Sequence, residues 1–112
     1  MIYMDNAATT RLSSRALEAM MPYLTEQYAN PAGTYSFTNA SNAAMEKARK
    51  QVADVIGAKS AEIFFTSGGT ESDNWALKGV MRANEKKGRH LIISAIEHHA
   101  ILHSAKALER EG

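Results

Sequence analysis

Residues 62–75, with the sequence EIFFTSGGTESDNW, limit the possible folds of this chain most strongly. The run at 63–65 is bulky and apolar, which is typical of a short strand covered on both faces. Gly68 and Gly69 allow a tight turn and leave room for a ligand to approach the main chain. We expect a helix to begin at Thr70. The motif therefore predicts a buried strand, a glycine turn and a helix.

A helix that begins behind a glycine turn is suited to binding an anion, because its first N–H groups have no partner within the helix. Glu71 and Asp73 fall in the first turn, where carboxylates favour the positive end of the helix dipole. One hypothesis is that the N–H groups of Gly69 and Thr70 and the hydroxyl of Thr70 bind a phosphate. The alternative is an ordinary strand-to-helix turn in which Thr70 caps the helix.

The composition narrows the class of protein without naming a function. The chain has 112 residues, which is enough for one small domain, and a net charge of +1. That balance argues against a nucleic-acid or membrane surface driven by bulk charge. The absence of cysteine excludes a disulfide framework within these residues. No apolar run approaches a membrane span, and no secretory signal is evident, so we expect a cytoplasmic protein.

The first half of the chain predicts a short strand followed by two helices. Residues 1–4 (MIYM) form the expected strand, and residues 5–10 the loop after it. Ser13 or Ser14 can cap the first helix, which Pro22 should kink or divide. The second helix should run over residues 39–56 and end at Gly57. Its expected inner stripe consists of Ala40, Ala44, Ala48, Val52 and either Val55 or Ile56.

The second half predicts two strand-and-helix pairs. The helix from Thr70 should end at Gly88, a buried strand should follow at 91–96, and a last helix should span 100–111. Ligands of open α/β sheets bind beyond the carboxyl ends of the strands. Residues 66–70 follow one predicted strand, and residues 97–99 follow the next. We therefore expect these two polar segments to lie at the same edge of one sheet.

His98 and His99 could serve as a general base, a metal ligand or a flat ring for stacking. A metal site is not expected, because no second ligand stands at a standard spacing and His103 is the nearest other histidine. Stacking on a planar cofactor, or proton transfer beside it, fits a phosphate site on the neighbouring strand.

Five stretches in order resemble the N-terminal portion of a cysteine desulfurase, in the class V aminotransferase family of fold-type I enzymes that use pyridoxal 5′-phosphate (PLP). The matching stretches are IYMDNAATT, MPYLTEQYANPAG, EKARKQVADVIGA, FFTSGGTESDN and GRHLIISAIEHHAIL. The resemblance implies an α/β fold: the N-terminal part of a three-layer large domain, with an incomplete sheet. Residues 1–14 would form an N-terminal arm belonging to the small domain, and residues 15–112 would begin the large PLP-binding domain.

The resemblance also implies site residues. Gly69 and Thr70 match the residues that bind the PLP phosphate. His98 matches the histidine that stacks on the pyridine ring and acts in proton transfer, whereas His99 stands at a variable place. Residues 30–31 resemble a loop near the site and the subunit interface. Tyr35 and Thr38 depart from the commonest pattern there, where many members have histidine and glycine.

The implied reaction converts L-cysteine to L-alanine and passes the sulfur as an enzyme persulfide to an acceptor such as an iron–sulfur scaffold, or to tRNA thiolation. The family is expected to act as a homodimer. Its PLP-binding lysine lies downstream, in a Ser-x-His-Lys motif, and these residues contain no cysteine to carry the persulfide. We therefore expect a fragment that is inactive and poorly stable alone. None of its lysines is expected at a strand end facing the site: Lys47, Lys50, Lys59, Lys78, Lys86, Lys87 and Lys106.

Alternative functions stay open at this point. The chain could belong to another class V enzyme, such as a selenocysteine lyase or a small-molecule aminotransferase. It could instead be a non-catalytic interaction module that binds a full-length subunit through residues 30–37, or a plain α/β domain without a ligand.

Overall fold

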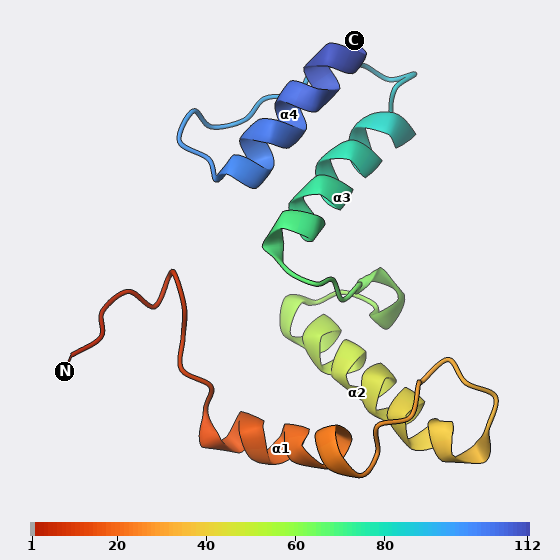
Figure 1. Cartoon of the computed structure of the whole chain (residues 1–112). Helices are drawn as coiled ribbons and strands as arrows, with labels where there is room; N and C mark the ends of the chain where they lie inside the picture. The colour runs from red at the N-terminus through yellow and green to blue at the C-terminus, as the bar shows by residue number, and fades with distance from the viewer. Residues whose placement is uncertain (1) are drawn as a thin grey trace. The chain divides into compact units, whose positions relative to one another are not determined.

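The computed structural model describes residues 2–112, which divide into one compact unit ending at Ile63 and a second unit from Phe64 to Gly112. Figure 1 shows the helices of both units. The first unit contains α1 (Ser14–Thr25), the short helix η1 (Ser36–Thr38), α2 (Asn39–Ile56) and the short helix η2 (Ser60–Glu62). The second contains α3 (Gly69–Ala83) and α4 (His99–Glu111). None of these helices is long and apolar enough to cross a membrane.

The ends of α1 and α2 follow from their sequence. The Ser13 hydroxyl oxygen accepts a hydrogen bond from the Ala16 N–H at 3.1 Å, which confirms the predicted cap of α1. Pro22 lies inside α1, which continues through it as one helix and is not divided. Gly57 ends α2 with a φ of 70°, a left-handed conformation that glycine adopts without steric cost.

The predicted inner stripe of α2 is only partly buried. Ala44 and Ala48 are half-buried, whereas Val55 and Ile56 are 85% and 66% exposed. The side chains that α2 does bury are Ser41 and Ala53. The Ser41 hydroxyl donates to the Gln27 carbonyl at 3.0 Å, so this contact fixes α2 against the preceding loop.

The predicted strands are wrong for this structure, since no β-strand occurs within residues 2–112. The segments at 63–65 and 91–96 were expected as strands, and neither pairs as one. Of the expected strand at 1–4, Met1 lies outside the described residues and the rest forms no strand. A parallel strand becomes regular only between neighbouring strands and beneath covering helices, because its backbone groups need partners. The incomplete sheet expected from the sequence is therefore not observed.

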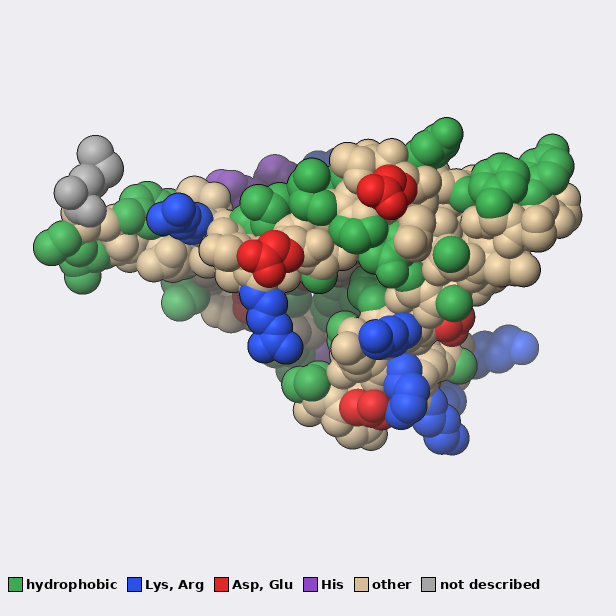
Figure 2. All heavy atoms as spheres, turned by 90° about the horizontal axis from the view of Figure 1, so that it is seen from below, with side chains coloured by type: hydrophobic (Ala, Val, Ile, Leu, Met, Phe, Trp, Pro, Cys, Tyr) green, Lys and Arg blue, Asp and Glu red, His purple; other side chains and the backbone are tan. Residues whose placement is uncertain are grey.

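The buried apolar core within residues 2–112 is small. It consists of Ala53, Ile63 and Ala100, while Ile92 and Ile96 are 83% and 94% exposed. Hydrophobic side chains accordingly reach the surface on the face drawn in Figure 2. A domain of ordinary stability needs a larger apolar area buried than three residues provide. These apolar side chains are exposed because no sheet forms that would cover them.

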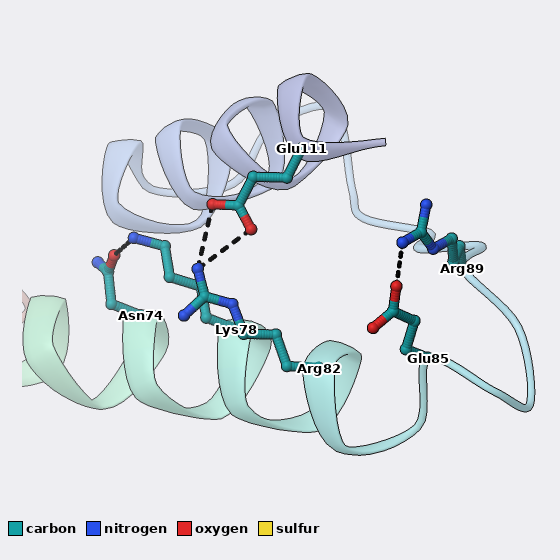
Figure 3. Close-up of polar contacts among 6 residues, drawn as sticks. All are labelled: Asn74, Lys78, Arg82, Glu85, Arg89 and Glu111. Carbon is teal, nitrogen blue, oxygen red and sulfur yellow. Dashed lines mark hydrogen bonds and ion pairs between the residues drawn. The ribbon is translucent and has the colours of Figure 1, made fainter.

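The second unit is a pair of packed helices, α3 and α4, that run in the same direction. The Arg82 guanidinium of α3 bonds both carboxylate oxygens of Glu111 in α4 at 3.1 Å (Figure 3). Arg89 pairs with Glu85 and also donates to the Gly112 carbonyl at 2.7 Å. α3 ends at Ala83, five residues before the predicted end at Gly88. Residues 84–87 form a turn in which the Asn84 side chain donates to the Val80 carbonyl at 2.9 Å.

Candidate functional site

The turn before α3 is held by side chains on either side of its two glycines. The Thr66 and Ser72 hydroxyls lie 2.6 Å apart, and the Glu71 carboxylate accepts from both the N–H and the hydroxyl of Ser67 at 2.7 Å. Gly68 occupies the N-cap position, so Thr70 lies within the first turn and is not the helix cap. The N–H groups of this turn have no partner inside the helix. The interpretation of Thr70 as a simple cap is therefore wrong.

Glu71 has a lowered pKa because the Ser67 N–H, and secondly the Ser67 hydroxyl, bond its charged carboxylate. A lowered pKa in the folded state stabilises the turn above the unfolded carboxyl pKa of about 4.3, and this contribution disappears as the pH falls through the folded pKa. We expect carboxyl NMR of the 112-residue chain to give Glu71 a pKa below the ordinary glutamate value. Ser67→Ala should raise it part of the way back. An unchanged pKa in that variant would contradict the assigned hydroxyl contact.

The two glycines of the turn leave space beside the main chain. A Cβ atom added at Gly68 or Gly69 would meet no other atom within 4 Å. Packing within this chain therefore does not require glycine at either position, and a group could approach the start of α3 there. This open space agrees with the anion-binding hypothesis for Gly69 and Thr70.

His98 lies at the start of α4 and is oriented by the helix itself. Its Nδ1 accepts a hydrogen bond from the Ala100 N–H at 3.1 Å, which makes His98 the N-cap residue. Because Nδ1 is the acceptor, the proton of the neutral ring is on Nε2. The His98 ring is thus held with a donor nitrogen free to face a ligand.

α3 and α4 bring Thr70 and His98 to one hollow of about 360 Å³. Both residues belong to the second unit, so the hollow lies within that unit. Gly69 does not line the hollow but immediately precedes Thr70 in α3. Pockets for small molecules and cofactors are commonly about 300–1,000 Å³. The residues that line the hollow are Thr70, Asn74 and Lys78 from α3, with His98, His99, Ala100, His103 and Ser104.

Sequence reasoning missed the roles of Asn74 and Lys78 at this hollow. The Lys78 ammonium donates to the Asn74 side-chain oxygen at 2.8 Å (Figure 3), and the Asn74 amide nitrogen donates to the Thr70 carbonyl at 2.9 Å. The three residues stand four apart, so they lie on one face of α3. That spacing is readable in the sequence, which places Lys78 on a predicted helix and not at a strand end facing the site. Lys78 therefore lines the hollow as part of α3.

Comparison with known proteins identifies the family. The sequence profile of the family "Aminotransferase class-V" matches residues 2–112. The chain belongs to the class V aminotransferase family. The "Cysteine desulfurase IscS" of Methanosarcina thermophila is 53% identical over 111 residues, covering 99% of this chain and 28% of the relative. The "Cysteine desulfurase" of Rattus norvegicus is 50% identical over 112 residues, covering 99% of this chain and 25% of the relative.

Solved structures agree with this assignment. A "NIFS-LIKE PROTEIN" superimposes with a TM-score of 0.91 at 46% identity, covering 99% of this chain and 30% of that one. A structure described as "SspA in complex with cysteine" superimposes with a TM-score of 0.88 at 37% identity, covering 98% of this chain and 32% of that one. The family uses PLP, and the similarity to cysteine desulfurases inferred from the sequence is confirmed. The chain spans between a quarter and a third of the length of these relatives.

Proposed function

We propose that this chain provides the phosphate- and ring-binding part of the PLP site of a cysteine desulfurase, an enzyme that converts L-cysteine to L-alanine and passes sulfur on as a persulfide. The observation that carries the proposal is the shared hollow, which brings together Thr70 and His98 from two different helices. The identity to desulfurases over nearly the whole chain supports the same conclusion. A selenocysteine lyase or another class V enzyme would use the same residues and remains the nearest alternative.

The residues at the hollow fit PLP by their chemistry. The start of α3 offers the N–H groups of Gly69 and Thr70 to a phosphate, and the Thr70 hydroxyl can donate a further bond. Glycine at position 69 leaves the space that a phosphate would need. His98 supplies a flat ring at the other side of the same hollow. When bound, PLP would supply the electron sink for the bond changes at the amino acid.

The position of the His98 proton indicates what this residue can do. With Nδ1 engaged by the Ala100 N–H, Nε2 is the nitrogen available to exchange a proton with a bound group. The same contact fixes the ring orientation, so stacking requires no rearrangement of the helix start. His98 would therefore combine ring stacking with proton transfer at Nε2.

Other parts of the reaction would have to come from outside these 112 residues. They contain no cysteine, so the persulfide must form on another segment or another chain. On this proposal residues 1–14 form an arm of the small domain, and residues 15–112 belong to the large PLP-binding domain. The complete protein would be a cytoplasmic homodimer that delivers sulfur to an acceptor such as an iron–sulfur scaffold, and the 112 residues alone would not turn over L-cysteine.

The role of Thr70 can be tested in a chimera in which these residues replace the matching segment of the Methanosarcina thermophila relative. We expect Thr70→Ala to weaken PLP binding by roughly 10- to 150-fold, because a hydrogen bond to a charged group contributes about 1.5–3 kcal/mol. Thr70→Ser keeps the hydroxyl and should restore most of the affinity. Binding of pyridoxal, which lacks the phosphate, should be unchanged in all three proteins.

An equal loss for PLP and pyridoxal would place the defect away from the phosphate and contradict the assignment of Thr70.

A second candidate function, an interaction module, is favoured by the loop before α2. There Tyr35 and Phe37 stack with centroids 5.6 Å apart, although both are 66% exposed. Exposed aromatic pairs of this kind are enriched at protein interfaces. No effect of either Thr70 variant on PLP binding would leave this second function as the better account.

A further inference from the structure

The first two turns of α4 carry a pair of histidines that the proposed function does not use. His99 and His103 stand four residues apart on one face of the helix, with ring centroids 5.5 Å apart and ring planes inclined by 31°. Both side chains are exposed. No metal site is expected from the sequence, on the ground that no second ligand stands at a standard spacing and His103 is the nearest other histidine. Two histidines at i and i+4 on a helix are, however, a standard pair of metal ligands.

The separation of the two rings suits a single ion between them. Two imidazole nitrogens that each bind one ion at about 2.0–2.1 Å lie no more than about 4.2 Å apart. Rings with centroids at 5.5 Å reach that arrangement by rotating their side chains, without a change in the helix. Neutral imidazole prefers borderline divalent ions such as Ni²⁺, Cu²⁺ and Zn²⁺.

The surrounding groups limit the site to these two ligands. Within residues 2–112 no group of three metal-ligating side chains converges. The His98 ring lies 6.2 Å from that of His99, and its Nδ1 is already engaged by the Ala100 N–H. The nearby Lys78 ammonium bonds Asn74. The positive end of the α4 dipole opposes a cation at His99, the first residue of the helix, and the effect is weaker at His103 in the second turn.

We propose that His99 and His103 form a two-imidazole site for a borderline divalent transition-metal ion, with water in the remaining coordination positions. The ion would link the first turn of α4 to the second and would therefore stabilise the helix. His99 and His103 line the same hollow as Thr70 and His98. The metal ligands are neither Thr70 nor His98, so the assignment of the two ligands does not depend on the proposed cofactor role of those residues.

The test is calorimetric titration of Ni²⁺ into the untagged 112-residue chain, with circular dichroism at each point to follow helix content. We expect one Ni²⁺ per chain and a gain in helix content on binding. His99→Ala and His103→Ala should each weaken binding by at least about tenfold, because one of two coordinate bonds is lost. His90→Ala removes an exposed histidine outside any helix and should leave the affinity unchanged.

A composition-matched variant separates a helical site from non-specific chelation. The double substitution His103→Lys, Lys106→His exchanges two exposed residues of α4 and moves the second histidine to a spacing of about two turns, which one ion cannot bridge. This variant should lose binding as completely as His103→Ala. Undiminished Ni²⁺ affinity in it, or in His99→Ala, would overturn the proposal even if the chain were only partly folded. Ni²⁺ binding should survive Thr70→Ala and His98→Asn, so the two proposals can fail separately.

Discussion

Replacing His98 by alanine in the chimera should lower the turnover of L-cysteine by about 10²- to 10⁴-fold, the usual contribution of a positioned proton-transfer group. The expectation rests on the His98 ring, which lines the same hollow as Thr70 and offers a protonated Nε2. Steady-state rates of L-alanine formation measure the loss. PLP affinity should fall as well, because the stacking surface is removed.

His98 also caps α4, so alanine removes two functions at once. His98→Asn provides the matched control, because asparagine is among the best N-cap residues and would still accept from the Ala100 N–H. We expect this variant to recover the stability of the cap, about 1 kcal/mol, and none of the turnover. His90→Ala, a substitution at an exposed loop position, should change neither quantity. Recovery of turnover by asparagine would show that His98 serves only as a cap.

The isolated 112-residue chain should show no sharp thermal unfolding transition. Its buried apolar core within residues 2–112 is Ala53, Ile63 and Ala100, which cannot offset the conformational entropy of ordering the chain. A stable domain has a free energy of unfolding of at least about 5 kcal/mol, and we expect a value well below this for the isolated chain. Its thermal unfolding should be broad, and it should bind a hydrophobic dye and associate as its concentration rises. Near-ultraviolet circular dichroism during heating measures the transition.

The chimera provides the comparison for that experiment. In it the same residues would have neighbouring strands, and the apolar side chains of Ile92 and Ile96 would gain partners. A cooperative melt in the chimera and a gradual one in the isolated chain would agree with this account. A sharp, reversible transition of the isolated monomer would contradict it, since the two helix-containing units would then be stable without a sheet.

The helices were predictable because their signals are local. Ser13 caps α1 through a contact three residues away, and Gly57 ends α2 by its own backbone conformation. The strands were not predictable in the same way, because a strand depends on partner strands that lie far away in the sequence. The apolar runs at 63–65 and 91–96 suit strands, but residues 2–112 do not form a sheet around them. The α/β class expected from the sequence agrees with the NifS-like structural relative. Residues 2–112 themselves form helices and no strand.

The sequence predicts Thr70 and His98 as site residues, and the structure places both at one hollow, but it does not predict the contacts around them. Thr70 and His98 follow from a glycine turn and a polar strand end, which are short patterns. Their approach to one hollow depends on how α3 packs against α4, which no short pattern specifies. Lys78 was missed for the same reason, since its place at the hollow follows from the α3 face and not from a strand end.

The most direct test of the account is a crystal structure of the chimera grown with PLP. We expect electron density for the phosphate within about 3.2 Å of the Gly69 nitrogen and the Thr70 hydroxyl, with the pyridine ring stacked on His98. PLP bound elsewhere, or with its phosphate away from the start of α3, would contradict the central claim that Thr70 and His98 line the cofactor site.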